Sequence, residues 1–200
     1  SDVCSSDLWI VDGKTAAHRI GLYGLLLGLC GRPQDAAVLA TMSRTDDARL
    51  LVGLDGILGG YCLLDEKQGV ERTLAVLVDP ALGFAHHFAA LRTVRFLLAR
   101  VPGVDRRLMM KKLTEAIALP DLSDLVIDEL RKEKHWQPVE QILALRRDGD
   151  NNLRGAVLRY ALACPDVRAT AFVAELKRTD PESAADRKST RLNSSHTVIS

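Results

Sequence analysis

The chain has 200 residues, a formal net charge of +1, and a composition that is 47% hydrophobic and 26% charged. This length and composition allow a large hydrophobic core, and the small net charge gives no long-range attraction to nucleic acid or acidic membranes. Aromatic residues make up only 4% of the chain. Leucine and alanine dominate instead, which favours helices over sheets that need Val, Ile, Tyr and Phe.

Three apolar helices are predicted first, over residues 14–30, 34–43 and 47–64. Gly31 ends the first helix as a C-cap, and Pro33 is well placed in the first turn of the second. The third begins at a capping aspartate, and its apolar residues recur with the spacing of a single helical face.

Glycines recur within two of these helices, although each costs about 1 kcal/mol of helix propensity relative to alanine. They predict that two helix backbones approach each other closely. These glycines are Gly21, Gly24 and Gly28 in the first helix and Gly53, Gly56 and Gly60 in the third. The uncharged run at 20–31 is shorter than the roughly twenty residues that a membrane span needs, so no span is predicted.

Seven further helices follow, each bounded by proline, glycine or aspartate. They are predicted over residues 70–78, 84–101, 105–118, 122–132, 138–148, 153–164 and 166–179. Gly69 is expected to separate the third helix from the fourth. All seven prolines of the chain fall at a helix boundary in this scheme, so the helix breakers agree with the apolar periodicity.

These helices pair into roughly five hairpins of about 28 to 40 residues, a period typical of helical repeats. We therefore predict an all-α fold, a right-handed α-solenoid in which neighbouring hairpins bury one another's apolar faces. The domain is expected to cover residues 9–180. A closed helical bundle is the alternative fold.

Short motifs in the chain resemble the P-[DE]-V-R-x-x-A start of a bacterial HEAT-type repeat. They are PDVRATA at 165–171, NLRGA at 152–156 and, more weakly, DAR at 47–49. As a whole the chain is similar to uncharacterised bacterial proteins with HEAT-like repeats. The hairpins at 84–118 and 121–148 lack the motif, so their assignment rests on periodicity alone.

The resemblance implies a fold and a habit of binding other macromolecules, but no reaction. It implies that Asp166 caps a helix and that Arg168 reaches an acidic residue of the adjoining repeat. Arg154 occupies the corresponding position one hairpin earlier. All three residues would then be structural.

The two ends of the chain, residues 1–8 and 181–200, lack the periodicity of the sequence between them. Both ends resemble peptides translated from sequencing-adapter DNA, namely SDVCSSDL at 1–8 and DRKSTRLNSSHTVIS at 186–200. On this hypothesis both ends are non-native and the chain is a fragment, so the compartment and any signal peptide stay open. The alternative for the C-terminal end is a natural disordered tail rich in serine and asparagine.

Neither the cysteines nor the histidines show the spacing of a metal site. Cys30, Cys62 and Cys164 lie at or near the ends of apolar faces, and we interpret them as core residues rather than a disulfide framework. Adjacent residues on a helix point about 100° apart, so His86 and His87 cannot chelate one ion from one face. His87 is expected to face the core and His86 the solvent. No metal or cofactor is predicted.

Asp55 interrupts the apolar face of the helix at 47–64, where a carboxylate needs a polar partner. An interhelix hydrogen bond, or an ion pair with an arginine of the next hairpin, is expected. General acid or base chemistry with His87 is the alternative. The sequence has no G-x-S-x-G motif, no phosphate-binding glycine loop and no dinucleotide fingerprint, so a non-enzymatic protein is predicted.

Basic residues gather on the predicted helices at 84–101 and 105–118. This basic cluster consists of Arg92, Arg95, Arg100, Arg106, Arg107, Lys111 and Lys112. It is typical of a phosphate-binding surface, or of a solvated face that the acidic run at 121–129 neutralises. Trp136 is either an exposed anchor for a partner or a wedge between hairpins, and we favour the wedge.

These observations together predict a non-enzymatic α-solenoid scaffold that binds another protein. The alternative function is a nucleic-acid-binding solenoid that uses the basic cluster.

Overall fold

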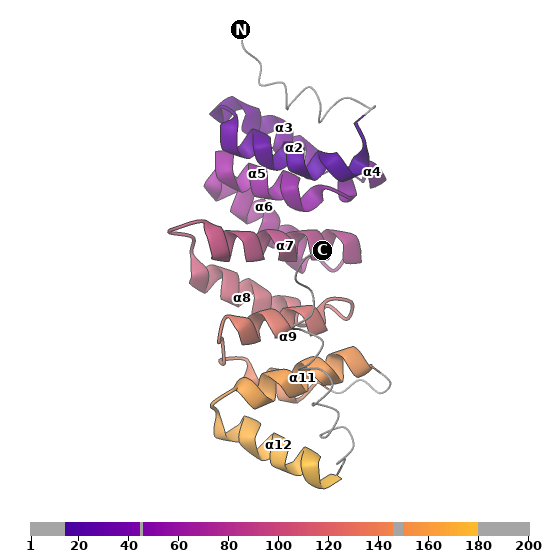
Figure 1. Ribbon diagram of the computed structural model, residues 1–200, viewed down its shortest axis with the longest axis vertical. Coiled ribbons are helices and arrows are strands. Elements are labelled where there is room, and N and C mark those ends of the chain that lie inside the picture. The colour runs from indigo at the N-terminus through magenta and orange to yellow at the C-terminus, as the bar shows by residue number, and fades with distance from the viewer. Residues whose placement is uncertain (1–14, 45, 146–149, 180–200) are drawn as a thin grey trace, which may run out of the picture. The chain divides into compact units, whose positions relative to one another are not determined.

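The computed structural model describes residues 15–44, 46–145 and 150–179 (Figure 1). Within these residues the chain is all-α, as the sequence predicts, with eleven α-helices, one short 3-10 helix and no strand. The chain divides into two compact units, Ser1–Val126 and Ile127–Ser200. We call them unit 1 and unit 2 and describe each by itself.

The segments predicted to be non-native, 1–8 and 181–200, lie outside the described residues. So do Cys4 and Gly149, the glycine expected to end the eighth predicted helix. Among the helices of the described residues, none combines the length and the apolar character that are needed to cross a bilayer.

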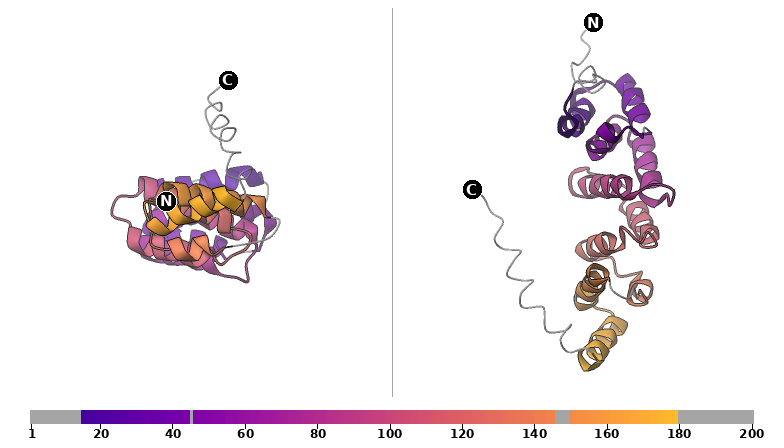
Figure 2. Two further views of the ribbon diagram at one scale, coloured as in Figure 1. Left: turned by 90° about the horizontal axis from the view of Figure 1, so that it is seen from below. Right: turned by 90° about the vertical axis from the view of Figure 1, so that its right-hand side faces the viewer.

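Unit 1 is built around α5, which packs against α2, α3, α6 and α7, while α6 also contacts α7 and α8. The right-hand view of Figure 2 shows α2, α5 and α7 along one side of this unit and α6 and α8 along the other. The elements are α2 (Ala17–Cys30), η1 (Pro33–Asp35), α3 (Ala36–Met42), α4 (Ala48–Leu51), α5 (Leu54–Leu64), α6 (Glu66–Val78), α7 (Phe84–Arg100), α8 (Arg106–Ala116) and α9 (Ser123–Lys132), which continues into unit 2.

Aspartates begin three helices of unit 1 by accepting a hydrogen bond from a backbone N–H of the first turn. Asp47 caps α4, Asp65 caps α6 and Asp105 caps α8. Asp65 is also the single residue between α5 and α6, so one side chain both separates the two helices and starts the second.

Helices α2 and α5 pack through glycine, which confirms the close approach that their sequences predict. A Cβ atom on Gly56 would overlap the carbonyl group of Gly21, and one on Gly28 would overlap the backbone of Gly60. Only glycine fits at these contacts. The close packing of the two backbones offsets the low helix propensity of glycine.

The predicted single helix over 47–64 is wrong, because the chain breaks between α4 and α5. Gly53 lies at this break as the N-cap of α5. A Cβ atom on Gly53 would overlap the backbone nitrogen of Gly21, so the break lets the chain approach α2. The apolar spacing continues across Gly53, and for this reason periodicity does not reveal the interruption.

The prediction that Gly69 separates two helices is also wrong. Gly69 lies inside α6 and is buried, and a Cβ atom there would be 2.5 Å from the backbone nitrogen of Cys62. Its small size lets α6 pack closely on α5, whereas Asp65 makes the separation between these two helices.

Unit 2 contains the second part of α9 together with α10 (Val139–Leu143), α11 (Asn151–Ala163) and α12 (Val167–Thr179). These last three helices contact one another pairwise. Pro138 begins α10, as predicted, but α10 ends at Leu143, so the predicted extent of 138–148 is wrong. The buried face of α11 has the apolar periodicity on which the predicted helix at 153–164 rests, and it consists of Leu153, Ala156, Val157, Tyr160 and Ala161.

Candidate interaction surface

His87 is buried in α7, as predicted, and its ring bonds to the loop that precedes α7. Its Nε2 lies 2.8 Å from the backbone carbonyl of Asp79, and its Nδ1 lies 3.5 Å from a carboxylate oxygen of Asp121. Because a carbonyl only accepts, Nε2 carries the proton. His86 is half-buried. Within the described residues no group of three or more His, Cys, Asp or Glu is placed to hold a metal ion.

Asp55 is held between α5 and α7 by polar contacts. Its carboxylate forms an ion pair with Arg92 at 3.0 Å, and its backbone carbonyl accepts a hydrogen bond of 3.1 Å from the Thr93 hydroxyl. This is the ion pair with an arginine of the following hairpin that the sequence predicts. Asp55 therefore joins two helices, which is a structural role.

Some residues of the basic cluster are paired with carboxylates on a neighbouring helix or on the same helix. Arg92 is paired with Asp55, and the Lys112 ammonium lies 2.5 Å from a carboxylate oxygen of Glu115. The other members are exposed or half-buried on α7 and α8, namely Arg95, Arg100, Arg106, Arg107 and Lys111. The positive surface is consequently smaller than the sequence alone indicates.

A groove of about 630 Å³ lies between α6 and α8, next to this cluster. Its apolar lining consists of Val70, Leu74, Ala75, Val104 and Leu108. Its charged lining consists of Glu66, Lys67, Glu71, Asp105 and Lys112. An apolar groove with polar groups at its edge can take up side chains of a protein partner or a small molecule.

Sequence reasoning misses this groove because its two walls lie far apart along the chain. Val70 and Leu74 follow the inward face of α6, yet Val70 is only half-buried. The one available signal is Leu108, a leucine among charged residues in the run RRLMMKKL, which is 37% exposed. An exposed leucine alone is common, however, and predicts no site.

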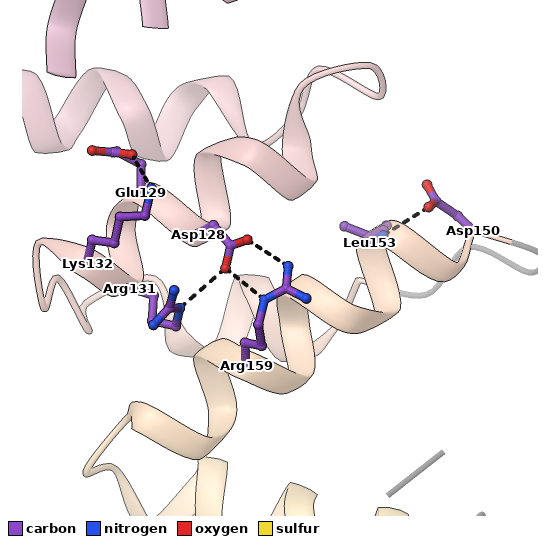
Figure 3. A network of polar contacts seen from close by, with 7 residues as sticks. All are labelled: Asp128, Glu129, Arg131, Lys132, Asp150, Leu153 and Arg159. Atoms are coloured by element: carbon purple, nitrogen blue, oxygen red, sulfur yellow. Dashed lines mark hydrogen bonds and ion pairs between the residues drawn. The ribbon is translucent and has the colours of Figure 1, made fainter. Parts of the chain in front are cut away.

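A polar network in unit 2 joins α9 to α11 (Figure 3). Asp128 accepts hydrogen bonds of 2.6 and 3.1 Å from the guanidinium of Arg159, and one of 3.3 Å from Arg131. Burial raises the pKa of Asp128, but the hydrogen bonds and charges of Arg159 and Arg131 outweigh burial and lower it. The arginine on α11 has no local signal in the sequence that would link it to Asp128.

Figure 3 also shows two contacts near this network. The buried Glu129 pairs with Lys132 at 3.3 Å, and Asp150 caps α11 by accepting a hydrogen bond of 2.9 Å from the Leu153 N–H. The acidic run at 121–129 thus has structural partners, because Asp121 faces His87 as well.

Trp136 packs against α11, in line with its interpretation as a wedge rather than an exposed anchor. Its ring lies edge-on to Tyr160, with ring centroids 5.2 Å apart. The Tyr160 hydroxyl donates a hydrogen bond of 2.9 Å to the backbone carbonyl of His135. Burial raises the pKa of Tyr160 and lowers that of His135, so both groups stay uncharged at neutral pH.

Arg168 joins the start of α12 to α10. Its guanidinium bonds to Asp166 at 2.7 Å and to Glu140 of α10, while its backbone N–H donates to Asp166. The hydrogen bond from the Arg168 side chain lowers the pKa of Asp166 to about 2. Arg154, the corresponding residue one hairpin earlier, is exposed in the first turn of α11.

The cysteines of the described residues are all free thiols. Cys62 and Cys164 are buried, as predicted, and burial raises the pKa of Cys62 to about 11. The core assignment of Cys30 is wrong, because this residue is exposed at the end of α2. The buried face of α2 is made by Ile20, Gly24, Leu27 and Gly28, and Cys30 lies to one side of it.

Comparisons of the chain with models of protein families, with curated proteins and with solved structures return no match.

Proposed function

We propose that the chain is a non-enzymatic helical scaffold, an α-solenoid of HEAT-like hairpins, that binds another protein. The observation that carries this proposal is the contact pattern of unit 1, in which α5 lies between α2 and α7 and α6 packs against α8. Such sequential packing of helices, each on its neighbours, is the basis of solenoids, and it leaves extended helix surfaces free for partners.

The polar residues that could have served catalysis support the same proposal, because they hold helices and loops together. Asp55 is bound to Arg92, and His87 bonds to the carbonyl of Asp79. Residues with such partners are oriented by the fold, and the contacts account for their burial without a substrate.

A protein partner fits the surface of unit 1 better than nucleic acid does. Phosphate binding draws its affinity from unpaired lysines and arginines, whereas Arg92 and Lys112 in the basic cluster are already paired with carboxylates. The apolar groove between α6 and α8 offers the kind of lining that protein side chains bury on association.

Affinity capture tests this proposal, with the full chain as bait in a lysate of the source organism. We expect a defined protein that stays bound after nuclease treatment and that excess free chain displaces. Binding of a labelled duplex DNA and a single-stranded RNA is measured in parallel at two salt concentrations. Tight nucleic-acid binding that falls steeply with salt, together with no nuclease-resistant partner, would contradict the proposal and favour the alternative function.

A further inference from the structure

We draw no further inference here: the strongest candidate, the exposed apolar face of α2 that Leu22, Leu26 and Leu29 form at helical spacing, carries none because nothing in the described residues shows what covers it.

Discussion

In unit 1, helices α2 and α5 meet through their backbones at glycine, whereas in unit 2 helix α11 is bound by charged side chains to α9 and by Tyr160 to the segment that follows α9. A Cβ atom on Gly56 would overlap Gly21, so the first contact depends on the absence of a side chain. The second depends on the presence of Asp128, Arg159 and Tyr160. The stability of the two units should therefore respond differently to an added side chain and to a fall in pH.

The largest expected effect is that of a single added methyl group in unit 1. Gly56→Ala places a carbon where the Gly21 carbonyl lies, and we expect a loss of about 3 kcal/mol in the free energy of unfolding or failure to fold. Gly59→Ala in the same helix is the control. Its nearest neighbour is 3.5 Å away, so the higher helix propensity of alanine should leave stability equal or raised by up to about 1 kcal/mol.

Urea unfolding followed by circular dichroism distinguishes these two variants. Equal stability of Gly56→Ala and Gly59→Ala would contradict the close contact of α2 and α5.

Loss of one hydroxyl group in unit 2 should have a smaller effect. Tyr160→Phe removes the hydrogen bond of 2.9 Å to the His135 carbonyl and keeps the ring contact with Trp136, so a loss of about 1 kcal/mol is expected. Tyr61→Phe is the matched change in unit 1, where the hydroxyl is 3.4 Å from Gln68. This longer contact should contribute less, and thermal unfolding of both variants measures the difference. A larger loss for Tyr61→Phe would reverse the comparison.

Neutralising the Asp128 carboxylate should reduce the free energy of unfolding by less than the loss of the Tyr160 hydroxyl does. Asp128→Asn weakens the bonds to Arg159 and Arg131. Because the pair is partly open to solvent, we expect a loss of about 1 kcal/mol or less in the free energy of unfolding. A double-mutant cycle with Arg159→Met isolates the pair interaction, and additive single effects would show that the pair contributes nothing.

Acid should act most locally on the start of α12. The folded-state pKa of Asp166 is about 2, below its ordinary value of 3.8. The contribution of the ionised Asp166 carboxylate to the stability of the folded state is therefore complete above about pH 4 and is lost as the pH falls through 2. Hydrogen exchange of the α12 amides at pH 5 and pH 2.5, corrected for the intrinsic rates, should show protection falling in acid. The change should be smaller in Arg168→Gln, and an identical change in that variant would contradict the assignment.

The sequence predicts best where local spacing and packing agree. The apolar face of α11 and the glycine contact of α2 with α5 follow from periodicity and from the cost of glycine in a helix. The inward orientation of His87 follows in the same way. These features depend on residues within a few turns of one helix.

Other features depend on residues that are distant in the sequence and have no local signal. The break at Gly53 and the burial of Gly69 follow from what α2 and α5 place beside them. The bond between Asp128 and Arg159 joins separate helices, and the groove needs both α6 and α8. Periodicity gives the buried face of each helix but not which helix lies next to it.

Photo-crosslinking in cells of the source organism tests the central claim most directly, with a photoreactive amino acid placed at Leu108 in the groove and, separately, at the equally exposed Leu162. The account predicts a discrete protein adduct from position 108 and none from position 162. An adduct with nucleic acid, the same adduct from both positions, or no adduct at position 108 would contradict it.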